Sequence, residues 1–139
     1  MRKTIYSVAA LALMGAANHA VAGAQQDAVL AEYKKLAIAA DPGFSGFSAD
    51  KGKNFFLADH TGGKADTPSC TTCHTKSPAN AGQTRAGKAI DPMAVSVSPD
   101  RFTDMAKTEK WFGRNCSSVL GRECTPQEKG DFISFMLTQ

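Results

Sequence analysis

The chain has 139 residues, of which 16 are basic and 13 acidic, and its formal net charge is +3 at pH 7. This length corresponds to one small domain, which is marginal for building a large core from side chains alone. The weak positive charge excludes the strongly basic face that a nucleic-acid-binding protein needs, so we expect no nucleic-acid partner.

The first 22 residues have the parts of a secretory signal peptide. Arg2 and Lys3 precede an apolar run, and small residues follow in "AVAGA". The apolar run is well short of the roughly 20 residues that span a bilayer, so we expect no stable membrane anchor. We predict cleavage after Ala22 or Ala24 and export to a periplasm. The mature chain then carries 14 basic and 13 acidic residues, a net charge of +1.

Two helices are predicted in the first part of the mature chain. Residues 25–40 form an amphipathic pattern, with apolar side chains at helical spacing: Val29, Leu30, Tyr33, Leu36 and Ala37. Residues 48–60 follow as a second helix with Ser48 as its N-cap. Gly52 lies four residues before Phe56 on the same helix face, where the missing side chain would let another helix cross closely.

The segment "TPSCTTCHTK" contains Cys70, Cys73 and His74 in the spacing C-x-x-C-H. This spacing attaches a c-type haem, because two thiols can reach the vinyl groups while the next imidazole binds the iron. A structural zinc site needs four protein ligands, and the mature chain has no second C-x-x-C and one other histidine. A thioredoxin-like pair would need a βαβ pattern, which is absent, and an ordinary disulfide is the third alternative. We therefore predict one covalently bound haem c.

The residue on the other side of the haem iron is less defined by spacing. His60 is the second histidine of the mature chain, and its place at the end of a helix is better explained as a surface position. Met93 and Met105 both follow the motif at a distance that suits a distal ligand. A methionine in a small core more often serves packing, so these residues leave the choice open.

A further helix is predicted over residues 103–115. Asn115 at its end would suit a cap, and Trp111 and Phe112 would suit either the core or the wall of a haem pocket. Three cationic residues recur at spacings of three and four, where they would form a docking face for an acidic cytochrome or a solvated face: Lys107, Lys110 and Arg114.

Two cysteines remain after the haem motif, Cys116 and Cys124. Four cysteines divide into two for the haem and two for a disulfide, because an exported protein meets an oxidising compartment. The loop that such a bond closes is small, so it would gain less than the ~3 kcal/mol expected for a 15-residue loop.

The last helix is predicted from Thr125, with Pro126 at its first position and Glu128 completing a capping box. Aromatic helices on both sides of C-x-x-C-H look like the class I cytochrome c arrangement, and no segment has a convincing strand pattern. We therefore expect an all-α, class I cytochrome c-like fold around one covalently attached haem, with an extra N-terminal helix. Residues 23–139 would form this single mono-haem domain, although the loop before Cys70 is longer than in ordinary class I chains.

The stretch "AGQTRAGKAIDPMAVSVSPDRFTDMAKTEKWFGRNCSSVLGRECTPQEKGDFISFM", together with "TGGKADTPSCTTCH", closely resembles the SHP family, the sphaeroides-type haem proteins. These are exported mono-haem c-type cytochromes, and the resemblance covers nearly everything after the second helix, including the long loop. The roles that the resemblance implies are thioether attachment for Cys70 and Cys73, proximal iron ligation for His74, distal iron ligation for Asn115, and a disulfide for Cys116 and Cys124.

The resemblance also implies a function. A dihaem c-type cytochrome would donate an electron, reduction would release Asn115 from the iron, and oxygen or nitric oxide would then bind. The alternative is a plain electron carrier that keeps six iron ligands throughout, with Met93 or Met105 as the distal one. A reductase or oxygenase acting on such a small molecule is a third hypothesis, although Asn115 and His60 are the polar groups that the sequence offers for it.

Overall fold

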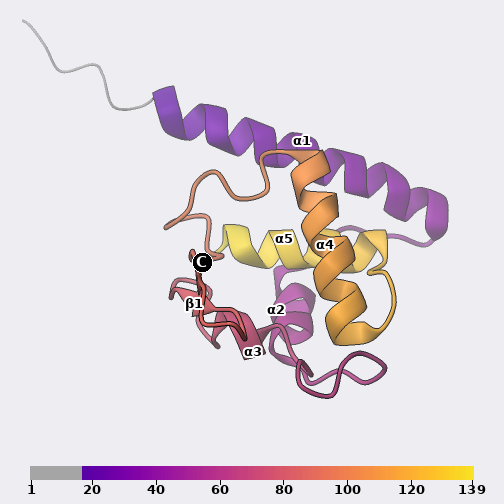
Figure 1. The fold of residues 1–139 in the computed structure, drawn as a ribbon. Helices are drawn as coiled ribbons and strands as arrows, with labels where there is room; N and C mark the ends of the chain where they lie inside the picture. Colours follow the sequence, from indigo (N-terminus) through magenta and orange to yellow (C-terminus); the bar gives the residue numbers. More distant parts are fainter. Residues whose placement is uncertain (1–16) are drawn as a thin grey trace, which may run out of the picture.

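The structure is a computed structural model that describes residues 17–139, with side chains from residue 23 onward. Five helices are present in this part of the chain: α1 (Ala17–Ala40), α2 (Ala49–Leu57), α3 (Thr71–His74), α4 (Met105–Leu120) and α5 (Pro126–Leu137). Figure 1 shows α1 running along one edge of the molecule, with α3 on the opposite side of α5. The expected all-α architecture is confirmed.

Two very short strands accompany the helices, which the sequence did not predict. Strand β1 (Gly82–Gln83) pairs antiparallel with β2 (Ala89–Ile90). Two residues are too few to produce a recognisable alternation of apolar and polar side chains. A Cβ added at Gly82 would overlap the backbone carbonyl of Cys73, so this glycine lets the ribbon lie against the haem-motif helix.

Residues 1–16, which carry most of the predicted signal peptide, lie outside the described residues. Within the described part, no helix is long and apolar enough to cross a membrane.

Helix α1 begins at Ala17, eight residues before the predicted start at residue 25. The preceding segment is rich in alanine, which has the highest intrinsic helix propensity, so the helix continues backward. Its buried stripe consists of Gln26, Val29, Tyr33 and Ala37. Leu36, which the pattern placed with the apolar residues, is 48% exposed because it lies on the flank of that stripe.

Helices α2 and α5 cross at Gly52, as the sequence predicted. A Cβ at Gly52 would overlap the backbone carbonyl of Asp131, so the two helix backbones are in close contact. The N-cap prediction for Ser48 is confirmed, since its hydroxyl accepts a hydrogen bond from the Lys51 amide at 3.3 Å. The Asp131 carboxylate accepts a second hydrogen bond from the Ser48 amide at 2.7 Å. The predicted end at residue 60 was wrong, because the helix stops at Leu57.

The core is aromatic and centres on the C-terminal helix. The capping box of Thr125 and Glu128 is present at its start, as predicted. The ring of Phe132 lies 5.9 Å from that of Phe56 on α2 and 5.4 Å from that of Phe112 on α4. Phe112 is therefore a core residue, and the same α5 face packs against helices from both halves of the chain.

A polar cluster joins α1, α4 and α5 at the edge of this core. The hydroxyl of Tyr33, which is fully buried, donates to Glu109 at 2.6 Å. The Lys129 ammonium donates to both oxygens of the same carboxylate at 2.9 Å. Burial and the neighbouring Glu109 raise the pKa of Tyr33 far above its ordinary value, so the phenol stays protonated.

Candidate functional site

The C-x-x-C-H motif lies on α3, a helix of a single turn. Cys70 occupies the N-cap position, and Thr75, with a φ of 60°, ends the helix. The hydroxyl of Ser69 accepts a hydrogen bond from the Thr71 amide at 3.2 Å and lies 3.5 Å from the carbonyl of Phe56 on α2. The motif is thus held against α2, one of the two aromatic helices that the sequence predicted on either side of it.

The two motif cysteines are free thiols in this structure, and both are partly buried. Burial raises the pKa of Cys70 to about 11, so this thiol is protonated at neutral pH. Neither cysteine forms a disulfide, so the ordinary disulfide that was considered as an alternative for this motif is not present in the structure. Among the described residues, no three His, Cys, Asp or Glu side chains gather as a metal site built from protein ligands would require.

His74 is held as a neutral imidazole. Burial, and to a lesser extent the nearby Arg101 cation, lower the pKa of His74 to about 4. Its Nδ1 atom is buried without a hydrogen-bond partner among the described residues. A neutral imidazole is the form that binds a metal, and unpaired buried nitrogens are uncommon in proteins. Two free thiols followed by such an imidazole fit the requirements of a covalently attached haem.

Residues 60–69, the loop that was longer than expected, connect the motif to the end of α4. The amide of Lys64 donates to the carbonyl of Ser118 at 2.7 Å, and the hydroxyl of Thr67 donates to the same carbonyl at 3.2 Å. A Cβ at Gly63 would overlap the backbone of Ser118 and Val119, so the loop lies directly on the helix. The extra length therefore has a structural use, because it fixes α4 relative to α3.

Asn115 lies inside α4, not at its end. The helix continues to Leu120 and ends at Gly121, whose φ of 69° suits glycine, so the interpretation of Asn115 as a cap was wrong. Its side chain is exposed, as is that of Trp111 one turn earlier, which is 48% exposed. Residues four apart share a helix face, so an amide and an indole stand together on α4 outside the core.

The predicted disulfide is present directly beside Asn115. Cys116 is bonded to Cys124, with 5.6 Å between their Cα atoms, and both residues are 4% exposed. The bond ties the last turns of α4 to the start of α5 at Pro126. Together with the loop over residues 60–69, it fixes the α4 backbone close to Asn115.

The other candidate distal ligands have packing partners in this structure. Met93 is 9% exposed and belongs to the apolar core, against which Met105 also packs. A ring nitrogen of His60, Nε2, lies 2.9 Å from the carbonyl of Phe55 within hydrogen-bond reach, and the two rings are 5.0 Å apart. These contacts favour structural roles for all three residues.

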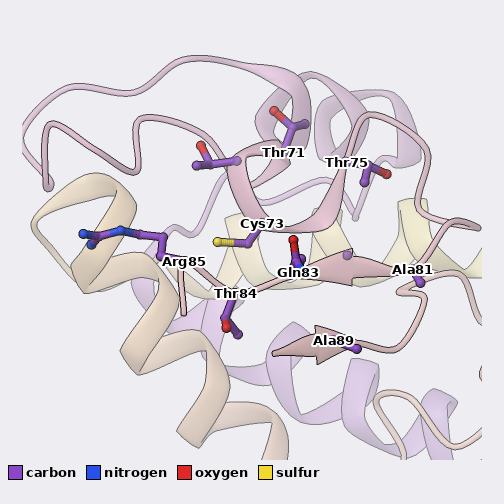
Figure 2. Close-up of a pocket in the computed structure, with 10 residues that line it drawn as sticks. Thr71, Cys73, Thr75, Ala81, Gln83, Thr84, Arg85 and Ala89 are labelled. Atoms are coloured by element: carbon purple, nitrogen blue, oxygen red, sulfur yellow. The ribbon is translucent and has the colours of Figure 1, made fainter. Parts of the chain in front are cut away.

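A hollow of about 510 Å³ lies beside the motif. Cys73, four threonines and residues of the β ribbon line it, and Figure 2 shows the Cys73 sulfur pointing toward the side on which Arg85 lies. Arg85 forms an exposed ion pair with Asp66 at 2.5 Å. The residues that line the hollow do not include His74 or Asn115, so it covers one edge of the candidate site only.

Two residues that connect the segment before α4 to the rest of the molecule were not singled out in the sequence. Arg101 lies in the segment before α4 and lowers the pKa of His74, and Gln26 on α1 binds the backbone of that segment. No sequence pattern marks this pair, because 75 residues separate them and neither belongs to a motif.

Comparisons with known proteins relate this chain to c-type cytochromes. Residues 42–136 match a family model described as "Domain of unknown function (DUF1924)". The cytochrome c-type protein SHP of Cereibacter sphaeroides is 58% identical over 91 residues, which cover 66% of this chain and 70% of that protein. The structure of oxidized SHP, described as an oxygen-binding cytochrome c, has a TM-score of 0.75 at 49% identity and covers 82% of this chain and 96% of its own.

A second solved relative is cytochrome c'' from Methylophilus methylotrophus. Its solution structure has a TM-score of 0.70 at 37% identity and covers 84% of this chain and 94% of its own. That structure is described as giving insights into the structural basis of haem-ligand detachment. At these identities and coverages the likeness extends over nearly the whole of both cytochrome structures.

Proposed function

Because this chain belongs to the SHP family of c-type cytochromes, we propose that it is an exported mono-haem protein that accepts an electron and then binds oxygen or nitric oxide. Its cofactor is one haem c, as in the cytochromes c that it resembles. The observation that carries the proposal is an exposed amide, Asn115, on a helix whose backbone is fixed at the next residue by a buried disulfide.

The haem is assigned to the residues of α3. Cys70 and Cys73 would hold it by thioether bonds, and the neutral imidazole of His74 would bind the iron from the proximal side. The haem, when bound, supplies a redox-active iron and the coordination positions on which gas binding depends. The protein contributes the position of these ligands, which Ser69 and the core helix α2 support.

Asn115 is assigned the distal side. An amide oxygen is a hard, neutral and weak ligand, so it tolerates ferric iron but competes poorly for the softer ferrous ion. We expect its side chain to leave the iron when the protein is reduced. The freed amide N–H groups then become available to donate a hydrogen bond to a diatomic ligand. One relative is described as binding oxygen and another by haem-ligand detachment, and both descriptions support a proposal in which a haem ligand can leave and a gas can bind.

The surroundings of Asn115 suit a movement limited to its side chain. The disulfide at Cys116 holds the helix on one side, and the bonds from Lys64 and Thr67 to Ser118 hold it on another. A fixed backbone would return the amide to the same place after each cycle of oxidation and reduction.

The electron donor is proposed to be a dihaem c-type cytochrome in the periplasm. Lys107, Lys110 and Arg114 are all exposed on α4, and the Arg114 guanidinium lies 5.4 Å from the centre of the Trp111 ring. Positive charge around an exposed aromatic residue would favour an acidic partner and speed its approach at low ionic strength.

Replacing Asn115 by Ala tests this assignment. The variant should still carry covalent haem, and its ferric form should be high-spin with an open distal position. Optical spectra of the oxidised proteins measure this directly. Ser117→Ala is the matched control, because Ser117 is also exposed on α4 but lies two positions further along the helix. An unchanged ferric spectrum in Asn115→Ala would refute the assignment of Asn115 as the distal iron ligand.

Carbon monoxide tests the second half of the proposal. The reduced wild-type protein should bind the gas at once under anaerobic conditions, because Asn115 has already left. A low-spin ferrous form that does not respond to the gas would mean a strong retained ligand, and the protein would then be a plain electron carrier.

A further inference from the structure

Arg101 carries a positive charge that no carboxylate balances in the described part of the chain. Its Nε donates to the carbonyl of Pro92 at 3.1 Å, and its Nη2 donates to the carbonyl of Asp91 at 2.6 Å. Both acceptors are neutral backbone groups. The ion pairs of the described residues involve other cations, namely Lys35, Arg85, Arg122 and Lys129. Arg101 is therefore a partly buried cation whose bonds are to neutral acceptors.

Arg101 binds a segment that lies next to the loop leaving the haem motif. The segment that Arg101 binds continues to Met93 and Ala94, whose amides both donate to the carbonyl of Pro78 at 2.8 and 2.9 Å. Pro78 follows His74 by four residues, so the segment lies beside the loop that leaves the haem motif.

Helix α1 fixes the backbone of Arg101. Gln26 is 2% exposed, and its side-chain amide donates to the carbonyls of Pro99 and Arg101 at 3.1 and 2.8 Å. The next residue, Phe102, has a φ of 60°, and its ring lies 6.1 Å from that of Phe132. A buried amide with two backbone acceptors is a specific contact, and it connects the extra N-terminal helix to the charge near the motif.

We propose that Arg101, held in place by Gln26, raises the reduction potential of the haem by keeping a positive charge close to the loop that leaves the haem motif. This inference rests on the proposed haem ligation by His74. A nearby cation disfavours ferric iron relative to ferrous iron, which has one positive charge less. Arg101 would thus favour the reduced state, in which Asn115 is expected to be free and a gas can bind. Gln26 is a positioning residue in this scheme.

The experiment is a redox titration of the holoprotein, followed by its absorbance, for the wild type and three variants. Arg101→Gln removes the charge. At a fixed solution potential, its ratio of ferrous to ferric protein should be about tenfold lower than that of the wild type, which corresponds to a midpoint potential lower by about 59 mV for one electron. Arg101→Lys keeps a positive charge, so its midpoint potential should stay close to that of the wild type.

Arg85→Gln is the control, because Arg85 is exposed and paired with Asp66. The midpoint potential of this variant should match that of the wild type.

Gln26→Ala gives a second test that leaves the charge itself in place. The midpoint potential of Gln26→Ala should be lower than that of the wild type, but by less than in Arg101→Gln. Arg101 keeps its charge in this variant and loses only the contact that fixes its backbone. The shift in Arg101→Gln should also persist at high salt, since partly buried charges are screened weakly. Equal midpoints for Arg101→Gln and wild type, or equal losses for Arg101→Gln and Arg101→Lys, would overturn the inference.

Carbon monoxide binding separates this inference from the proposed function. A wild-type protein that ignores the gas but loses potential in Arg101→Gln would refute the gas-binding function and support the role of Arg101. A wild-type protein that binds the gas, with an unchanged midpoint potential in Arg101→Gln, would support the gas-binding function and refute the role of Arg101.

Discussion

Gly52→Ala is the substitution whose effect follows most directly from the packing. The new methyl group would overlap the carbonyl of Asp131, and a backbone carbonyl cannot rotate away as a flexible side chain can. Such overpacking typically costs about 1–3 kcal/mol, and we take the upper figure of about 3 kcal/mol because the contacted atom belongs to the backbone. Alanine recovers about 1 kcal/mol through its higher helix propensity. We expect a net loss of about 2 kcal/mol, which corresponds to a fall in Tm of about 8 °C for a domain of this size.

Gly113→Ala is the matched control, because Gly113 is also helical but nothing lies within 4 Å of its added Cβ. This variant should gain up to about 1 kcal/mol from helix propensity alone. Urea denaturation of both holoproteins, followed by far-ultraviolet circular dichroism, measures the free energy of unfolding. If Gly52→Ala is as stable as Gly113→Ala, the close crossing of α2 and α5 is not required and the reasoning fails.

Two further predictions concern the methionines and the Glu109 cluster. Replacing both Met93 and Met105 by Leu should leave the ferric spectrum unchanged, whereas a shift in that spectrum would favour a methionine on the iron. Burial opposes ionisation of Glu109, but hydrogen bonds from Tyr33 and Lys129 outweigh it and hold the pKa of this carboxyl below its ordinary value of 4.5. Its stabilising contribution is complete above pH 4.5 and is lost as pH falls toward the lower folded pKa. The free energies of unfolding of wild type and Glu109→Gln, measured by urea denaturation, should therefore converge as the pH is lowered below 4.5. A difference that stays constant with pH would contradict the role of this carboxylate.

The N-termini of α2 and α5 were predictable because their signals are local. The Ser48 hydroxyl accepts from the Lys51 amide, and the side chains of Thr125 and Glu128 each accept from the other's amide, so a few adjacent residues determine the geometry. The other helix ends were predicted less well. Helix α2 stops at Leu57, and α4 runs on past Asn115 to Gly121. The position of an end inside a favourable sequence depends on what the following segment contacts.

The candidate site divides in the same way. Cys70, Cys73 and His74 stand within five consecutive residues, so their spacing alone predicted covalent haem attachment. The two cysteines that remain, Cys116 and Cys124, indicated a disulfide. The role of Asn115 came from family resemblance alone, since its own surroundings in the sequence suited a cap equally well. No part of the sequence identified Gln26, because its partners lie on a different segment of the chain.

The sequence by itself determined the haem motif, the caps of α2 and α5 and the glycine at their crossing, because each depends on residues within one or two helical turns. Only the tertiary structure decided that residues 60–69 bind the end of α4, and that α1 holds the backbone of Arg101. These contacts join segments about 50 to 75 residues apart, between polar groups that many other positions also carry. Their partners are selected by the packing of the whole core, which no local pattern encodes.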